Sequence, residues 1–180
     1  SQAHPKDCKR SLDAGAGGVI VPMVESPEQL KNVIEHCAWP PTGQRGVGFS
    51  RANLFGKYFE EYKEEAQSPI IVAQIENIHA VAVLEQILSV SGLDAILIGP
   101  YDLSASLGKP GKWDHPSVIE ALEKTNKILM ENDKPGGFHV VHSNHKELKH
   151  RIAQGYTFIA YGDDMVFFAE TIAAETNFIN

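Results

Sequence analysis

The chain has 180 residues, of which 43% are hydrophobic and 22% charged, the proportions of one globular domain with a sizeable core. Its formal net charge of −7 disfavours nucleic acid and anionic membrane surfaces as partners. No stretch approaches the ~18 apolar residues of a membrane-spanning helix, and the two cysteines form no disulfide framework, which favours a cytoplasmic location.

Helices and strands alternate along the chain. In order, the patterns predict a helix at 5–14, a strand at 19–21, a helix from 27 that stops before Pro40, a glycine-rich irregular loop at 42–51, a charged helix at 55–67, a strand at 70–74, a helix between Asn77 and Gly92, a strand at 93–98, a helix at 116–129, a strand at 138–141, a helix between Asn144 and Gly155, a strand at 158–161 and an apolar helix at 165–174. Ser26 is suited to cap its helix, and Gln29 can reach back as in a capping box.

The strands are continuous apolar runs rather than alternating ones, so we expect a parallel sheet buried on both faces. Two α/β architectures fit five strand–helix units preceded by one helix: part of a (β/α)8 TIM-type barrel, or a complete open sheet of five strands. An eight-stranded barrel needs ~250 residues, and no strand precedes the first helix. We therefore expect a single barrel domain over 1–180 that is incomplete at its N-terminal side, with about five strands present and roughly three units missing ahead of Ser1.

Two carboxylates follow buried strands that are one strand–helix unit apart. Glu76 ends the run that begins at Ile70, and Asp102 comes soon after the run that ends at Ile98. Adjacent parallel strands present such residues at the same edge of the sheet, where α/β proteins carry their sites. Alone, each acid is more typical of a solvated loop or a helix start, but together they indicate an oxygen-ligand site for a hard divalent ion.

The segment Gly99-Pro100-Tyr101-Asp102 adds an anion-binding element to this site. A helix that begins near Asp102 would point its first N–H groups into the same cleft, and Gly99 would allow a ligand to approach the backbone closely. A metal beside such a helix start suits a 2-oxo acid, because the metal polarises the keto group and stabilises an enolate during C–C bond cleavage.

These motifs are similar to those of the HpcH/HpaI aldolase family, metal-dependent (class II) aldolases that act on 2-oxo acids. The segments that carry the resemblance are Gln74-Ile75-Glu76, Gly99-Pro100-Tyr101-Asp102-Leu103-Ser104, Val21-Pro22-Met23-Val24, Pro40-Pro41-Thr42-Gly43-Gln44-Arg45-Gly46-Val47-Gly48 and Tyr161-Gly162-Asp163. They occur in order over nearly the whole chain. The resemblance implies a phosphoenolpyruvate/pyruvate-type barrel that cleaves a 4-hydroxy-2-oxo acid to pyruvate and an aldehyde, through a metal-stabilised pyruvate enolate.

The resemblance also implies residue roles. Glu76 and Asp102 would bind Mg²⁺, Mn²⁺ or Co²⁺, and Gln74 would contact the pyruvate or its metal-bound water. The backbone at Gly99, Pro100, Tyr101 and Asp102 would hold the substrate carboxylate. The family's arginine and His–Asp pair would lie upstream of Ser1, so we expect these 180 residues to be a poor catalyst alone. The family implies a homo-oligomer that exchanges its last helix, whereas the pattern at 165–174 by itself favours an ordinary core helix.

Two other functions stay open. One is a citrate-lyase-beta-like lyase, which the loop at 40–46 disfavours, and the other is a non-catalytic truncated barrel that binds a metal and a keto acid. Arg45 and Arg51 are equally candidates for a phosphate or dicarboxylate contact and for solvated loop positions. The histidines fit surface and loop positions better than a zinc site, although His142 could face the cleft; they are His139, His142, His145 and His150.

Overall fold

The computed structural model describes residues 4–176. The α-helices are α1 (Pro5–Asp13), α2 (Pro27–Cys37), α3 (Phe59–Gln67), α4 (Ile78–Ala82), α5 (Leu84–Leu88), α6 (Pro100–Ser106), α7 (Pro116–Met130), α8 (His145–Ala153) and α9 (Asp164–Thr176), with one 3₁₀ helix, η1 (Arg51–Gly56). The strands are β1 (Gly18–Val21), β2 (Ile70–Ile75), β3 (Ala95–Ile98), β4 (Gly136–Val140) and β5 (Phe158–Tyr161). No helix among these is long and apolar enough to cross a membrane.

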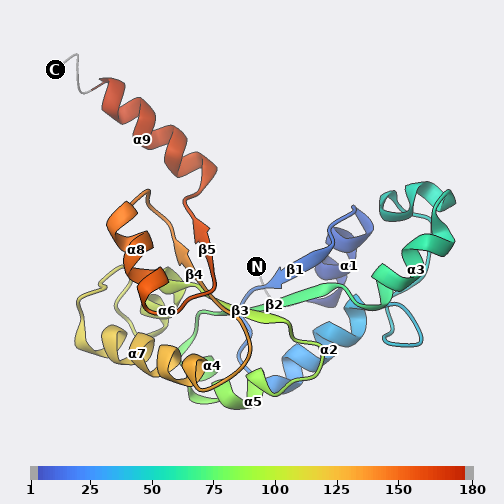
Figure 1. The fold of residues 1–180 in the computed structure, drawn as a ribbon, viewed down its shortest axis with the longest axis horizontal. Coiled ribbons are helices and arrows are strands. Elements are labelled where there is room, and N and C mark those ends of the chain that lie inside the picture. Colours follow the sequence, from blue (N-terminus) through green and yellow to red (C-terminus); the bar gives the residue numbers. More distant parts are fainter. Residues whose placement is uncertain (1–3, 177–180) are drawn as a thin grey trace.

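The five strands form one parallel sheet whose spatial order is the chain order, β1-β2-β3-β4-β5. A doubly wound sheet reverses its strand order at a switch point, and this sheet does not. Because successive crossovers share one hand, the helices gather on the same side and the sheet curls away from them. Figure 1 shows α2, α4, α5 and α7 along the outer side of this arc. The prediction of a partial barrel is therefore confirmed over the open sheet.

The main core lies between the convex face of the sheet and its helices. In β2 the buried side chains are Ile71, Ala73 and Ile75, which pack in one cluster with helix residues such as Leu30 and Leu84. The alternate residues of β2 point to the concave face and are only partly buried or exposed. Among the described strands, β3 is buried along its whole length and β4 at all residues but His139. The expectation of strands buried on both faces was wrong for β1, β2 and β5, which are only partly buried.

Helix capping follows the sequence closely at α2 and α4. The Ser26 hydroxyl accepts from the Gln29 N–H (3.2 Å), and the Asn77 side chain accepts from the His79 N–H (2.9 Å). Gln29 does reach back, but its Oε1 accepts from the N–H of Glu25 (2.8 Å), one residue before the cap. The free cysteines of α1 and α2 are buried, as expected for a chain without disulfides.

The charged helix predicted from residue 55 begins only at Phe59. Leu54, Phe55 and Gly56 all have positive φ (46°, 57° and 98°), so the backbone turns left-handed and cannot enter an α-helix there. The helix predicted after Asn77 is likewise divided into α4 and α5, because Val83 leaves helical geometry (φ −116°, ψ 21°).

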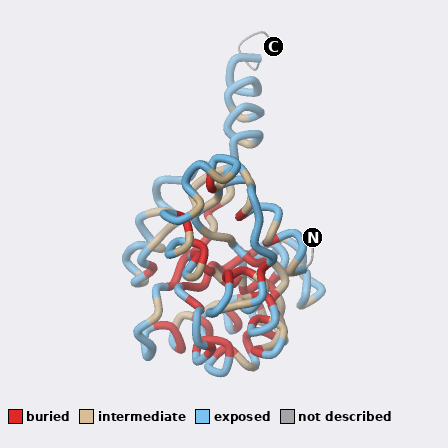
Figure 2. Tube along the Cα trace, turned by 90° about the vertical axis from the view of Figure 1, so that its right-hand side faces the viewer, coloured by how far each residue is buried: buried red, intermediate tan, exposed pale blue. Residues whose placement is uncertain are grey.

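The last helix, α9, stands away from the rest of the chain, as Figure 2 shows. None of its residues is buried. Met165 is 68% exposed and Phe168 64%, although a helix packed in a core would bury such side chains. The pattern that favoured an ordinary core helix was therefore wrong, because apolar composition does not reveal which molecule covers the helix.

Candidate active site at the carboxyl ends of the strands

Glu76 lies directly after β2 and is only 3% exposed. Its Oε1 accepts from the N–H of Met23 (2.7 Å), which follows β1, and its Oε2 accepts from the side chain of Gln74 (2.6 Å). Burial raises the pKa of the Glu76 carboxyl above its ordinary value, the Met23 hydrogen bond opposes this, and the negative charge of Asp102 raises the pKa further. The protein therefore fixes a carboxyl group whose ionised form is disfavoured by burial.

Gly99 provides the space that this arrangement needs. A Cβ at position 99 would lie 2.7 Å from Glu76 Oε2 and 2.8 Å from Gln74 Nε2. Its φ is −98°, so glycine is required here for close approach and not for backbone freedom. The predicted grouping of Gln74, Glu76 and Gly99 at one edge of the sheet is thus present in the structure.

The Met23 peptide was not anticipated from the sequence. Its φ is 52°, an uncommon conformation for a residue other than glycine. Its N–H donates to Glu76, and its carbonyl accepts from the Gln29 side chain (3.1 Å). The segment 21–24 had been noted as a motif, but a contact made by a backbone N–H leaves no mark in residue identity.

Asp102 lies exposed in the first turn of α6. Its negative charge adds to the effect of burial in raising the pKa of Glu76. Within 4–176 no group of three or more His, Cys, Asp or Glu side chains is placed to hold a metal ion. Two carboxylates with a carboxamide nearby nonetheless fit a hard divalent ion such as Mg²⁺, which commonly takes one or two protein carboxylates and fills its other positions with water or substrate.

The loop that leads into α6, which consists of Gly99 and the first helical residues Pro100 to Asp102, offers fewer backbone donors than its four residues suggest. The Gly99 N–H donates to the Ile75 carbonyl (3.1 Å), and Pro100 has no N–H. The first turn of a helix leaves its N–H groups without intrahelical partners. The donors of this loop that suit a carboxylate are therefore those of Tyr101 and Asp102.

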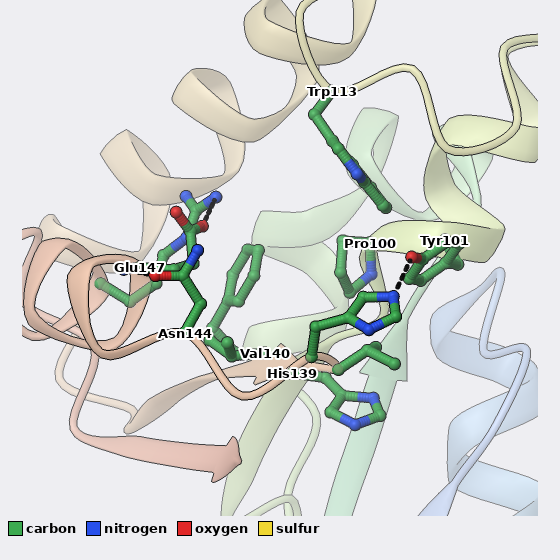
Figure 3. A pocket seen from close by; sticks show the side chains of 11 residues that line it. Pro100, Tyr101, Trp113, His139, Val140, Asn144 and Glu147 are labelled. Atoms are coloured by element: carbon green, nitrogen blue, oxygen red, sulfur yellow. Dashed lines mark hydrogen bonds and ion pairs between the residues drawn. The ribbon is translucent and has the colours of Figure 1, made fainter. Parts of the chain in front are cut away.

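Beside this loop is a pocket of about 280 Å³. It is lined by Pro100, Tyr101, Trp113, Phe138, His139, Val140, Val141, His142, Asn144, Glu147 and Arg151. Figure 3 shows Tyr101 at one side of it, and the Tyr101 hydroxyl is within hydrogen-bonding distance of His142. His142 Nε2 and the Tyr101 phenol oxygen are 3.2 Å apart. His142 therefore faces this segment, as the sequence allowed, but it contacts the Tyr101 side chain and not the two carboxylates.

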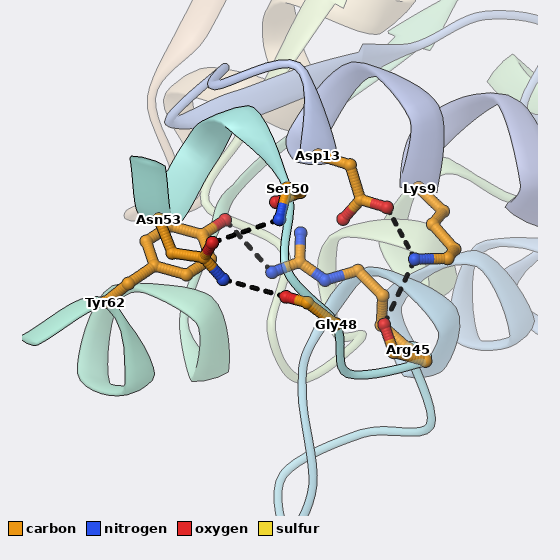
Figure 4. Close-up of polar contacts among 8 residues, drawn as sticks. Lys9, Asp13, Arg45, Gly48, Ser50, Asn53 and Tyr62 are labelled. Atoms are coloured by element: carbon orange, nitrogen blue, oxygen red, sulfur yellow. Dashed lines mark hydrogen bonds and ion pairs between the residues drawn. The ribbon is translucent and has the colours of Figure 1, made fainter. Parts of the chain in front are cut away.

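The two loop arginines have different environments. Arg45 is 1% exposed, donates to the Tyr62 hydroxyl (3.1 Å) and lies over the Trp39 ring at 5.6 Å. Figure 4 shows its guanidinium directed toward Tyr62. Arg51 is exposed. Arg45 is thus neither a solvated loop residue nor placed at the strand ends, and burial by a loop of irregular structure could not be read from the sequence.

Comparisons with known proteins agree with this geometry. The family model described as HpcH/HpaI aldolase/citrate lyase matches residues 1–171. The chain is 36% identical over 167 residues to the hydroxypyruvate/pyruvate aldolase of Roseobacter denitrificans (91% of this chain, 64% of that protein). It is 35% identical over 167 residues to the 4-hydroxy-2-oxovalerate aldolase of Rhodococcus jostii (92% and 64%). The crystal structure of an HpcH/HpaI aldolase from Desulfitobacterium hafniense superposes with a TM-score of 0.84 at 30% identity (99% and 69%). The chain thus spans 64% of the length of these two curated relatives.

Proposed function

Because the chain belongs to the HpcH/HpaI aldolase/citrate lyase family, we propose that it carries the metal-binding part of an aldolase site that cleaves a 4-hydroxy-2-oxo acid to pyruvate and an aldehyde. The observation that carries the proposal is the buried Glu76 carboxylate, which is held by Gln74 and the Met23 N–H and is coupled to the charge of Asp102. Two relatives bear the names of aldolases for hydroxypyruvate/pyruvate and for 4-hydroxy-2-oxovalerate, which supports this substrate class.

Glu76 and Asp102 would hold the divalent ion, Mg²⁺, Mn²⁺ or Co²⁺. When bound, such an ion supplies a Lewis acid for the keto oxygen of the substrate. The chain's own groups would position the substrate: the N–H groups of Tyr101 and Asp102 would donate to its carboxylate, and the Gln74 amide, which donates to Glu76, would contact the pyruvate portion. Gly99 has no side chain, so these groups can meet without intervening atoms. These hydrogen-bond donors would thereby stabilise the negative charge of the bound substrate.

Calorimetry with Mn²⁺ and oxalate, a non-reacting mimic of a 2-oxo acid, tests the metal assignment. We expect Mn²⁺ and oxalate each to tighten the binding of the other in the wild-type chain. Glu76→Gln and Asp102→Asn should abolish this coupling. Glu85→Gln is the matched control, since Glu85 is an exposed glutamate on α5. Coupled binding that survives in both site variants would overturn the assignment.

We propose further that the protein assembles as a homo-oligomer in which α9 packs on a second copy. The support is the exposure of its apolar side chains: Met165 68%, Phe168 64% and Ile172 45%. Monomeric proteins rarely leave such a helix face uncovered. Light scattering across a dilution series checks this proposal, and a mass equal to that of one chain at all concentrations would contradict it.

A further inference from the structure

We propose that Glu170, His142 and Tyr101 form a hydrogen-bonded chain that fixes the first turn of α6, with His142 as a positioning residue for the site. The proposal rests on the function proposed above, because its purpose is to hold the helix turn that carries Asp102. The three residues come from different parts of the fold: Glu170 from α9, His142 from the segment after β4, and Tyr101 from α6. The position of α9 is thereby linked to the site.

The donors and acceptors of this chain have one consistent order when the imidazole is neutral. Glu170 Oε1 lies 3.0 Å from His142 Nδ1, and Glu170 Oε2 accepts from the Ser143 hydroxyl (2.8 Å). Since an ionised carboxylate can only accept, Nδ1 carries the proton and Nε2 is left as an acceptor. The Tyr101 hydroxyl, 3.2 Å from Nε2, therefore donates to it. The hydrogen bonds from His142 and Ser143 also lower the pKa of Glu170, which agrees with an ionised carboxylate.

Tyr101 is held on several sides, so a shift of its phenol would shift its backbone. Its ring packs edge-on against Trp113, with centroids 4.7 Å apart. Its carbonyl accepts from the Ser104 hydroxyl (2.7 Å), which in turn accepts from the Gly111 N–H (3.0 Å). The hydrogen bond to His142 adds a further contact, at the hydroxyl end of the Tyr101 side chain. Since Asp102 is the next residue, the orientation of Tyr101 sets where that carboxylate and its N–H point.

The other end of the chain is the contact between α9 and the body of the protein. No residue of α9 is buried, so polar contacts account for much of its attachment. Glu170 supplies two of them, to His142 and Ser143, while Phe167 packs against Tyr161 with ring centroids 6.2 Å apart. A change in the position of α9 would therefore alter the first turn of α6 through His142.

Hydrogen exchange of the amides of residues 103–105, the first with partners within α6, measures the order of the start of this helix directly. We expect His142→Ala, Tyr101→Phe and Glu170→Ala each to speed this exchange by about fivefold, as loss of one hydrogen bond of about 1 kcal/mol predicts. The double variant of Tyr101 and His142 should exchange no faster than either single variant, because both remove the same bond. His142→Gln, which restores a side-chain acceptor, should recover part of the protection, and His150→Ala on the exposed face of α8 is the matched control.

The Mn²⁺ affinity is the second measurement, and we expect it to fall two- to fivefold in His142→Ala but not in His150→Ala. Unchanged exchange in His142→Ala, or changed exchange with an unchanged Mn²⁺ affinity, would overturn the positioning role. Absence of Mn²⁺ binding by the wild-type chain would instead refute the proposed metal site. In that case the hydrogen-exchange comparison alone decides whether the hydrogen-bonded chain orders the first turn of α6. Equal exchange rates in His142→Ala and His150→Ala would refute this ordering role.

Discussion

Replacing Gly99 by alanine tests the arrangement of the site at a single atom. The added Cβ would lie 2.7 Å from Glu76 Oε2, 2.8 Å from Gln74 Nε2 and 3.1 Å from Glu76 Cβ. The first two distances are shorter than ordinary contacts by more than half an ångström, so the Gln74 and Glu76 side chains must move away from position 99. Since φ at this position is −98°, alanine brings no backbone strain, and the whole effect comes from crowding.

Overpacking of this kind costs about 1–3 kcal/mol, and the reduced freedom of the unfolded chain returns about 0.4–1 kcal/mol. We expect a net loss of about 1–2 kcal/mol in the free energy of unfolding, which shifts the urea midpoint down by about 0.5–1 M for a slope near 2 kcal/mol/M. The Mn²⁺ affinity should fall as well, because crowding displaces Glu76 and its hydrogen-bond partner Gln74 from the positions in which they are 2.6 Å apart.

Gly48→Ala is the control for this variant. Position 48 has no atom within 4 Å of an added Cβ, so the substitution should leave stability unchanged or slightly higher. If Gly99→Ala and Gly48→Ala have the same urea midpoint and the same Mn²⁺ affinity as the wild-type chain, then Glu76 does not lie against position 99, and the proposed site geometry is refuted.

Three further predictions concern other parts of the molecule. Burial and the charge of Asp102 raise the folded-state pKa of Glu76. Without divalent ions, the free energy of unfolding should therefore fall as pH rises from the ordinary glutamate pKa through the folded-state pKa, and then level off. Glu76→Gln should remove this fall, and the same pH profile in the variant and the wild-type chain would contradict the prediction. Gly137→Ala brings a Cβ within 2.2 Å of the Phe158 ring and should cost about 1–3 kcal/mol in urea unfolding; the cost should shrink in a Phe158→Ala background, and additive effects would refute the contact. Phe168→Asp should change the free energy of unfolding by less than about 0.5 kcal/mol but lower the mass measured by light scattering, whereas an unchanged mass would argue against α9 as an interface.

The parts of the fold that were predictable are those with local signals. Ser26 caps its helix as expected, and the apolar runs predict both ends of each of the five strands to within two residues. The start of α3 was misplaced because Leu54 and Phe55 adopt positive φ. Neither residue type favours that conformation, so tertiary contacts must impose it, and a sequence pattern carries no record of them.

The site divides in the same way. Glu76 and Gln74 could be placed because strand ends in a parallel sheet meet at one edge. Gly99 was expected to admit a ligand, whereas in the structure its lack of a side chain makes room for Gln74 and Glu76. The Met23 N–H and the burial of Arg45 could not be foreseen, since one is a backbone contact and the other depends on how an irregular loop folds over Trp39. The exposure of α9 could not be read from its own pattern, because an apolar composition does not distinguish a helix that its own chain covers from one that it leaves exposed.

The agreement between the spatial order of the strands and their order along the chain has a consequence for how the chain folds. Each strand pairs only with the strand before it and the strand after it along the chain, so no pairing has to wait for a distant segment. The connection from Gly18 to its partner Ile70 is more than twice as long as that from Val72 to Ala95. Closing the longer connection costs only about 0.7 kcal/mol more in chain entropy, yet the long irregular loop in it must also be ordered. During synthesis, β2 and β3 can therefore pair as soon as both have emerged, and β1 is expected to be the last of these three to reach its final register.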